Sequence, residues 1–152
     1  MPNDFEELVA GEEEQLAPNG ERYFRQCHPS FIQNDQPSSQ FLGDFPRDGG
    51  RLSGTRSTVV NATESFLDFT RVAGGKSAGT WGITIAEAND AGSRVVDDSG
   101  SPQTVPARPR GHVYLDMRHF EPAERKTAVS ALLIAFKAHG QLAALGDFEE
   151  AV

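Results

Sequence analysis

The chain has 152 residues, enough for one domain, and it carries a formal net charge of −8 with a single cysteine, Cys27. One cysteine excludes an intramolecular disulfide and a thiolate-rich zinc site, and the acidic balance disfavours general binding to nucleic-acid backbones. No apolar stretch approaches the roughly 20 residues of a membrane span, and the N-terminal residues lack the basic and apolar regions of a signal peptide. We therefore expect a cytoplasmic protein without membrane association.

Both ends of the chain are acidic and poor in apolar residues. Residues 1–20 include the run Glu12–Glu14, and the segment from Asp147 to Val152 is also acidic. Such composition is typical of solvated segments that keep a protein soluble. We expect an acidic flexible N-terminal tail over 1–20, a single domain over 21–140 and an acidic C-terminal tail over 141–152.

The first predicted element is a short strand from Arg22 to Cys27, which ends because proline follows closely and cannot donate a ladder hydrogen bond. A polar stretch without helical or strand periodicity then extends to Leu52. Long irregular connections in compact domains are uncommon and are usually functional or disordered, and disordered segments are poor in aromatic residues. This stretch contains Phe31, Phe41 and Phe45, so we expect an ordered loop that its phenylalanines fasten to the domain.

The middle of the chain predicts a strand, a helix and a second strand. A brief strand from Leu52 to Ser57 precedes a helix from Thr58 to Arg71, in which apolar residues recur at helical spacing. Asn61 and Glu64 have the spacing of a capping box near its start. Thr80 to Ala88 alternates apolar with small or polar side chains, and this period of two predicts the clearest strand of the chain.

The last third predicts a short strand from Arg94 to Val96, a surface loop over 97–111, a strand from His112 to Met117 and a helix from Pro122 to about His139. The whole order predicts an α+β fold, a small two-layer sandwich in which two helices pack on a mainly antiparallel sheet, with a long ordered polar loop. The residues that we expect in its core are Trp81, Ile83, Ile85, Leu115, Leu132, Leu133 and Phe136.

The polar loop is the main candidate for a functional site. Arg25 lies at its start, and the planar fork of arginine suits carboxylate or phosphate groups. Cys27 shares the strand face of Arg25, whereas His28 points to the opposite face. A thiol nucleophile needs its base within hydrogen-bond reach, so we expect Cys27 to be a small buried apolar group.

The first hypothesis is an accessory or binding protein that uses residues 25–57 as its contact surface, with another protein as partner and no cofactor required. Loops rich in donors and acceptors bind peptides, nucleotides or protein backbones, and the chain has no P-loop, GxGxxG, GxSxG or HExxH motif. The residues expected to bind are Arg25, His28, Ser39, Gln40 and Arg56. The oligomeric state stays open.

The alternative is a small enzyme that acts on a nucleotide or another phosphate-bearing substrate, with Arg25 and Arg56 as anion clamps and His28 as acid or base. The order Arg25, Ser53 and an acid at Glu64 or Glu87 resembles the arginine–serine–glutamate arrangement of ADP-ribosyltransferases. That resemblance implies NAD as the ligand. Its phosphates would lie on Arg25, a serine of the hydroxyl cluster Ser53/Thr55/Ser57 would brace the nicotinamide side, and Glu64 or Glu87 would activate the ribose.

A second resemblance involves two histidines. His28-Pro29-Ser30 and His112-Val113-Tyr114 resemble the paired motifs of 2H phosphoesterases, in which the histidines act as acid and base across a phosphodiester. The candidate catalytic residues of the two enzyme hypotheses are thus Arg25, His28, Ser53 and Glu87.

His112, Tyr114 and Asp116 fall on one face of a predicted strand. A histidine and an aspartate two residues apart can fix a tautomer or provide two metal ligands, but the spacing indicates no third ligand, and we expect no metal site. Antiparallel sheets often leave one face to solvent. We therefore expect these three residues to form a plain exposed sheet face.

Overall fold

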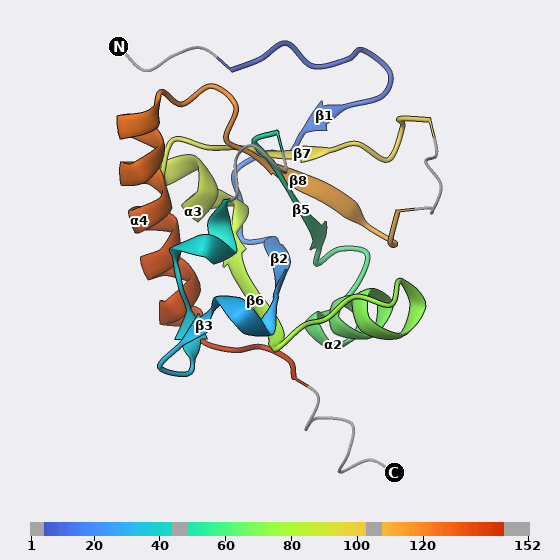
Figure 1. Cartoon of the computed structure of the whole chain (residues 1–152). Helices are drawn as coiled ribbons and strands as arrows, with labels where there is room; N and C mark the ends of the chain where they lie inside the picture. Colours follow the sequence, from blue (N-terminus) through green and yellow to red (C-terminus); the bar gives the residue numbers. More distant parts are fainter. Residues whose placement is uncertain (1–4, 44–48, 103–107, 145–152) are drawn as a thin grey trace.

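A six-stranded sheet forms the centre of the molecule, with helices on both of its faces (Figure 1). The computed structural model describes residues 5–43, 49–102 and 108–144. The strand order is β1-β7-β8-β5-β2-β6, and every neighbouring pair is antiparallel. The α+β class predicted from the sequence is therefore confirmed.

The elements have the following bounds. The sheet consists of β1 (Glu14–Gln15), β2 (Arg22–Cys27), β5 (Arg51–Arg56), β6 (Gly79–Thr84), β7 (Val95–Asp97) and β8 (His112–Asp116). The polar loop contains the 3-10 turns η1 (Pro29–Phe31) and η2 (Ser39–Leu42) and a separate pair of strands, β3 (Ile32–Gln33) and β4 (Gln36–Pro37). The helices are α2 (Ala62–Leu67), its π-helical continuation η3 (Asp68–Val72), α3 (Ile85–Asp90) and α4 (Pro122–His139).

The long helix α4 begins and ends where the sequence predicted. Pro122 stands in its first turn, where a backbone N–H has no helical partner. Gly140 ends it at a φ of 75°, which glycine adopts without the strain of a side chain. Its buried residues Ala128, Leu132 and Phe136 recur every four positions and form the stripe that packs on the sheet.

Strand alternation divides the sheet into two faces. Tyr23 of β2 points toward α4, where its ring contacts Phe136 edge-on, and the core cluster gathers on this side. All seven predicted core residues belong to the cluster or pack against it, Leu133 being only partly buried. The short helix α2 lies against the opposite face, where the Thr80 hydroxyl donates to the carbonyl oxygen of Ala62.

The predicted strand from Thr80 to Ala88 is wrong in its second half. The strand ends at Thr84, and α3 occupies Ile85–Asp90. Thr84 accepts a hydrogen bond from the Glu87 N–H, while the Glu87 carboxylate accepts one from the Thr84 N–H. The alternation of apolar residues continues past Thr84, but the capping box satisfies two backbone donors there and so favours a helix start over a longer strand.

The helix predicted from Thr58 to Arg71 is shorter and less regular in the structure. Its α-helical part begins after Asn61, and the predicted capping box with Glu64 is confirmed. From Asp68 the chain continues as a π-helical turn.

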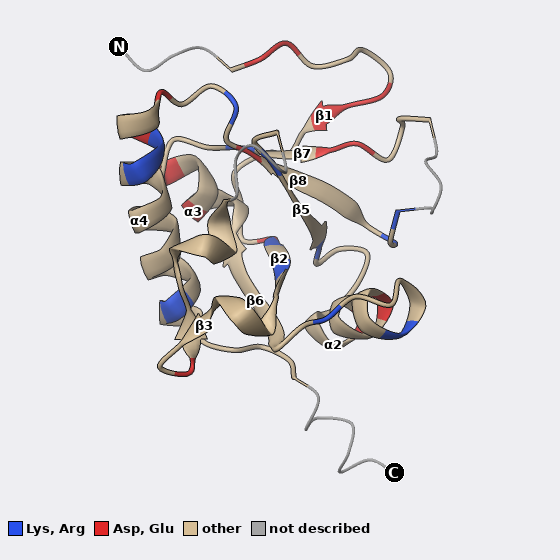
Figure 2. Cartoon of the chain, in the orientation of Figure 1, with Lys and Arg blue, Asp and Glu red and all other residues tan. Residues whose placement is uncertain are grey.

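The N-terminal segment does not behave as a tail in its described part. β1 pairs with β7 at the sheet edge, and Leu16 is buried. Arg94 donates to the carbonyl oxygen of Glu6 and lies over the ring of Phe5, 4.3 Å from its centre. Figure 2 shows acidic residues along this segment, above the β7 and β8 edge of the sheet. At the other end, Ala143 bridges to Thr80, and residues 145–152 lie outside the described ranges.

The expectation that His112, Tyr114 and Asp116 form an exposed sheet face is wrong for Tyr114 and Asp116, whereas His112 is partly buried. Tyr114 and Asp116 are buried, because the N-terminal segment folds over them and the Tyr114 hydroxyl donates to the Glu13 carboxylate. Asp116 lies between the guanidinium groups of Arg94 and Arg118, each 2.9 Å away. The sequence pattern did not reveal this cover, since Glu13 precedes Tyr114 by 101 positions.

The polar loop is fastened to the domain largely as predicted. Phe41 is buried against Phe136 and Trp81, with ring centres 5.0 and 6.4 Å away, and Phe31 packs half-buried on the core. Phe45, the third predicted anchor, lies outside the described residues.

Candidate functional site

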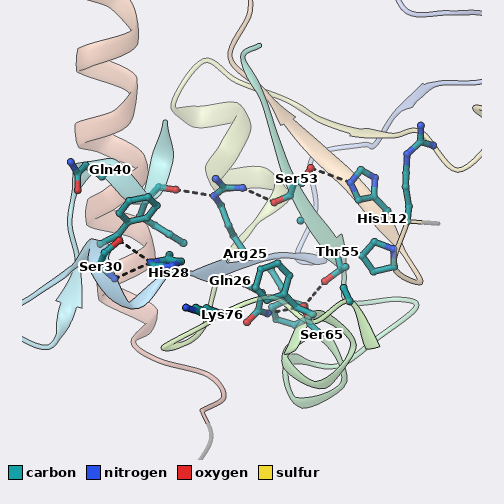
Figure 3. Close-up of a pocket in the computed structure, with 18 residues that line it drawn as sticks. Arg25, Gln26, His28, Ser30, Gln40, Ser53, Thr55, Ser65, Lys76 and His112 are labelled. Carbon is teal, nitrogen blue, oxygen red and sulfur yellow. Dashed lines mark hydrogen bonds between the residues drawn. The ribbon is translucent and has the colours of Figure 1, made fainter. Parts of the chain in front are cut away.

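A cavity of about 760 Å³ lies beside the sheet, between the polar loop, β2, β5, the end of α2 and the start of β8. Its apolar walls come from the rings of Phe24, Phe31, Phe41, Phe69 and Pro109. Its polar residues are Arg25, Gln26, His28, Ser30, Gln40, Ser53, Thr55, Ser65, Lys76, Arg108 and His112 (Figure 3). This volume is within the usual range for small-molecule sites, roughly 300–1,000 Å³.

Two neighbouring strands, β2 and β5, stop pairing beside the cavity. β2 and β5 pair only through Tyr23 with Arg56 and Phe24 with Thr55. Beyond this point Arg25 spans the gap: its Nε donates to the Phe41 carbonyl oxygen at 2.8 Å, and its Nη1 donates to the Ser53 carbonyl oxygen at 2.7 Å. Figure 3 shows this guanidinium between His28 on one side and Ser53 on the other.

One wall of the cavity holds a chain of hydrogen bonds that joins three strands or strand ends. His112 Nδ1 lies 2.7 Å from Asp98 Oδ1, and His112 Nε2 lies 3.2 Å from Ser53 Oγ. The sheet register explains the arrangement, since Asp97 faces Val113 and Thr55 faces His112. Side chains that are diagonal or opposite on one sheet face are within reach of each other.

The floor of the cavity is a second, separate polar cluster. Thr55 Oγ1 and Ser65 Oγ lie 2.7 Å apart, and the Gln26 amide donates to Ser65 and to Thr80. These bonds tie α2 to the sheet and satisfy buried polar groups. We regard this floor as a scaffold for the cavity.

The charged side chains that line the cavity in the described part of the chain are all basic. Arg25, Lys76 and Arg108 are basic, and none of the described residues that line it is Asp or Glu. Asp98 stands behind His112 and is nearly buried. Arg108 Nε lies 3.8 Å from Asp98 Oδ2. The surface offered to a ligand is therefore basic although the whole chain is acidic.

The structure brings together some of the residues predicted as a site and separates others. Arg25, His28, Gln40 and Ser53 all line the cavity. Ser39 lies instead in a smaller hollow between η2 and α4, which Gln40 also lines.

Arg56 and Glu87 lie outside the cavity. Arg56 pairs with Glu21 at 2.8 Å and with Asp97 at 2.9 Å, so its charge is already engaged by carboxylates. Glu87 lies on α3, where its carboxylate accepts from the Thr84 N–H and pairs with His139. Burial alone would raise the pKa of Glu87, but the bonds from Thr84 and His139 lower it below its ordinary value.

The other acid considered for the transferase arrangement does not line the cavity either. Glu64 caps α2 and lies 3.5 Å from Arg110. The cavity therefore contains the arginine and serine of that arrangement without its glutamate.

Cys27 is a buried apolar group, as expected. Burial raises its pKa to about 11, although the nearby Arg25 charge acts in the opposite direction. A thiol with such a pKa is protonated near neutral pH and is a poor nucleophile.

Lys76 and Arg108 of the cavity wall, and Asp98 behind His112, were not predicted as site residues from the sequence. Lys76 lies in the connector after the π-helical turn, whereas Asp98 and Arg108 flank a proline-rich stretch that predicted only a surface loop. A hairpin of Arg94–Val96 with His112–Met117 would have placed Asp98 opposite His112, since the observed register pairs Asp97 with Val113.

Within the described ranges there is no group of three or more His, Cys, Asp or Glu side chains placed to hold a metal ion. No helix among those residues is both long and apolar enough to cross a membrane.

Comparison of the chain with protein-family models, with curated proteins and with solved structures gave no match. The chemistry of the cavity therefore carries the functional assignment.

Proposed function

We propose that this protein is a small enzyme that acts on a phosphate-bearing substrate, a nucleotide or a molecule of similar size and charge, bound in the cavity. One observation carries the proposal: three basic side chains and two imidazoles line a cavity with half-buried aromatic walls, and no carboxylate is among the described residues on its surface. Arg25 and Lys76 offer an anionic ligand positive charge that no carboxylate among the described residues engages, whereas Arg108 already lies 3.8 Å from Asp98.

Arg25 and Lys76 have N–H donors that make no hydrogen bond within the described residues and can contact a phosphate. Arg25 uses Nε and Nη1 on backbone oxygens, and its Nη2 has no partner among the described residues. Lys76 is exposed at the cavity rim and likewise makes no hydrogen bond or ion pair within the described ranges. Charge-assisted hydrogen bonds of this kind contribute about 1.5–3 kcal/mol each.

The apolar part of the ligand fits the other lining groups. Phe31 and Phe69 are half-buried and line the cavity, so part of each ring is open to a ligand. A nucleobase or another planar group stacks favourably on such rings. The amide of Gln40, which is exposed at the rim, supplies both a donor and an acceptor for its edge.

The hypothesis of an accessory protein with residues 25–57 as a protein contact surface has weaker support. Phe41 and Leu42 are buried in the core. Arg25, His28 and Gln40 line a cavity suited to a small molecule. A flat, exposed patch is what a protein partner would favour, and we do not propose it as the main function.

A binding titration with matched variants tests the proposal. Adenosine 5′-monophosphate, inorganic phosphate and uncharged adenosine serve as ligands, and calorimetry or thermal shift measures affinity. We expect the monophosphate to bind more tightly than adenosine, and Lys76→Ala to raise its Kd by about tenfold, which is the loss of one charge-assisted contact. Lys137→Ala, an exposed lysine in the last turn of α4, is the matched control and leaves the Kd unchanged.

Two results would contradict this proposal. Equal or absent binding of all three ligands removes the phosphate site, and equal effects of the two lysine substitutions show that only overall charge is being sensed.

A further inference from the structure

We propose that Ser53 is a nucleophile, that His112 is its general base, and that Asp98 positions His112, so that the cavity hydrolyses a phosphate ester through a phosphoserine intermediate. This inference rests on the proposed function for its substrate class. The activation of Ser53 itself rests only on the geometry of the three residues.

The hydrogen-bond distances fit the roles. With Asp98 as its partner at 2.7 Å, Nδ1 of His112 carries the proton, and this N–H donates a hydrogen bond to the carboxylate. Nε2 is then unprotonated and accepts the Ser53 hydroxyl at 3.2 Å. An acid, an imidazole and a hydroxyl in this order form the arrangement that activates serine nucleophiles on unrelated folds.

The surroundings also fit. Ser53 is exposed to the cavity, whereas Asp98 is 7 % exposed and lies behind the imidazole. A buried carboxylate whose hydrogen bond fixes one imidazole tautomer is the usual support of such a base. Arg25 donates to the Ser53 carbonyl oxygen, so its guanidinium stands beside the nucleophile, where it can neutralise the charge that develops on phosphoryl oxygens.

The chemical steps balance without a further reactant except water. Ser53 Oγ forms a bond to phosphorus as the bond between phosphorus and the leaving oxygen breaks, and the hydroxyl proton passes to His112 Nε2 and then to the leaving alkoxide. Water then attacks the phosphoserine and gives a proton to His112. Ser53 Oγ leaves phosphorus and takes that proton, so the net products are the alcohol and phosphate.

The same cavity contains an internal comparison. Ser30 Oγ lies 2.8 Å from His28 Nδ1, but that nitrogen also accepts the Ser30 N–H at 3.0 Å. No carboxylate contacts His28 among the described residues, so nothing there fixes the imidazole as a base for Ser30. The pair Ser30 and His28 is therefore a turn contact, and of these two serines Ser53 has the full set of groups.

Labelling with diisopropyl fluorophosphate tests the nucleophile directly. The reagent phosphorylates an activated serine and releases fluoride, and because it is uncharged it does not need the anion site. Intact-protein mass spectrometry followed by peptide mapping reads the result. We expect one adduct, on Ser53, in the parent and in Ser30→Ala, and none in Ser53→Ala.

The role of Asp98 is tested with the same reagent. Asp98→Asn should lower the labelling rate by about 10²-fold or more, because the wrong imidazole tautomer is then favoured. Asp98→Glu should recover part of the rate, since it restores a carboxylate; a role limited to holding the fold would not separate these two variants. Thermal melting of each variant verifies that it is folded.

The outcomes distinguish this inference from the proposed function. A folded parent that is not labelled, or is labelled on Ser30, overturns the role of Ser53 even if adenosine 5′-monophosphate binds. Labelling of Ser53 in a protein that binds no phosphate ligand supports the nucleophile and contradicts the proposed substrate class.

Discussion

Arg25 Nη1 donates to the carbonyl oxygen of Ser53 at 2.7 Å, at the point where β2 and β5 have separated. The same guanidinium donates through Nε to the carbonyl oxygen of Phe41. One side chain thus joins two strands and the polar loop, and it also faces the cavity. The site and the local fold depend on the same residue.

Arg25→Lys should weaken both functions of this side chain. A lysine keeps the charge but cannot present two fixed donors to the two carbonyl oxygens. We expect a loss of about 1–3 kcal/mol in the free energy of unfolding and a roughly tenfold higher Kd for adenosine 5′-monophosphate. Urea denaturation and calorimetry measure the two effects. Arg51→Lys is the matched control, because Arg51 is an exposed β5 arginine outside the cavity; equal effects of both changes would contradict the assigned role.

Substitutions along α4 should reveal which face packs on the sheet. Leu132 is fully buried, Leu133 is partly buried and Ile134 is 70 % exposed. We expect Leu132→Ala to cost about 2–5 kcal/mol and Ile134→Ala to change the free energy of unfolding by less than about 0.5 kcal/mol. Leu133→Ala should fall between them. Denaturant unfolding measures the series, and a larger loss at Ile134 than at Leu132 would show that α4 presents a different face.

Asp116 should make the stability of the protein pH-dependent. Burial alone would raise its pKa, but hydrogen bonds and charge from Arg118, with a hydrogen bond from Arg94, lower the pKa below its usual range. A lowered carboxyl pKa stabilises the fold above the unfolded-state value of about 3.9, and this stabilisation is lost as the pH falls through the lower folded-state value.

The substitution Asp116→Asn tests whether the Asp116 carboxylate makes the stability pH-dependent. Near neutral pH the substitution should cost about 3–5 kcal/mol, because the nearly buried Arg94 loses its counter-charge. The difference between parent and variant should shrink as the pH falls below about 4, where the Asp116 carboxyl becomes protonated first in the unfolded chain and, at still lower pH, in the folded protein. Urea denaturation over this pH range decides it; a difference that stays constant with pH would show that the carboxylate charge is not involved.

Phe41→Ala should loosen the polar loop. Phe41 is buried between Phe136 of α4 and Trp81 of β6, so its removal should cost about 3–5 kcal/mol. Under native conditions we expect faster proteolytic cleavage within residues 30–43 than in the parent, while far-ultraviolet circular dichroism retains the helical signal. Cleavage at the parent rate would mean that other contacts hold the loop.

Periodicity in the sequence predicted those parts of the fold that depend on local pattern. The face of α4 with Leu132 and Phe136 and the strand face of Trp81 and Ile83 follow directly from burial at regular spacing. The prediction went wrong at Ile85, where an alternating pattern continued into a helix whose start is fixed by a capping box.

Part of the cavity could be predicted from the sequence, because Arg25, His28, Gln40 and Ser53 lie in or near the polar loop. Asp98 and Lys76 come from connections, and their approach to the site depends on strand pairing rather than on any local motif. Arg56 was selected for its charge, but Glu21 and Asp97 bind it elsewhere. Ion pairs between residues so far apart in the sequence cannot be predicted from the spacing of residue types.

The most direct test of the central claim uses the four histidines of the chain as reporters. His28 and His112 line the cavity, whereas His119 lies between the rings of Phe5 and Phe120 and His139 pairs with Glu87. Imidazole signals in a proton–carbon NMR titration with adenosine 5′-monophosphate follow all four at once. We predict that the signals of His28 and His112 shift and saturate together, while those of His119 and His139 stay in place. No shift at millimolar ligand, or equal shifts of all four, would contradict the assignment of the cavity as a phosphate-ligand site.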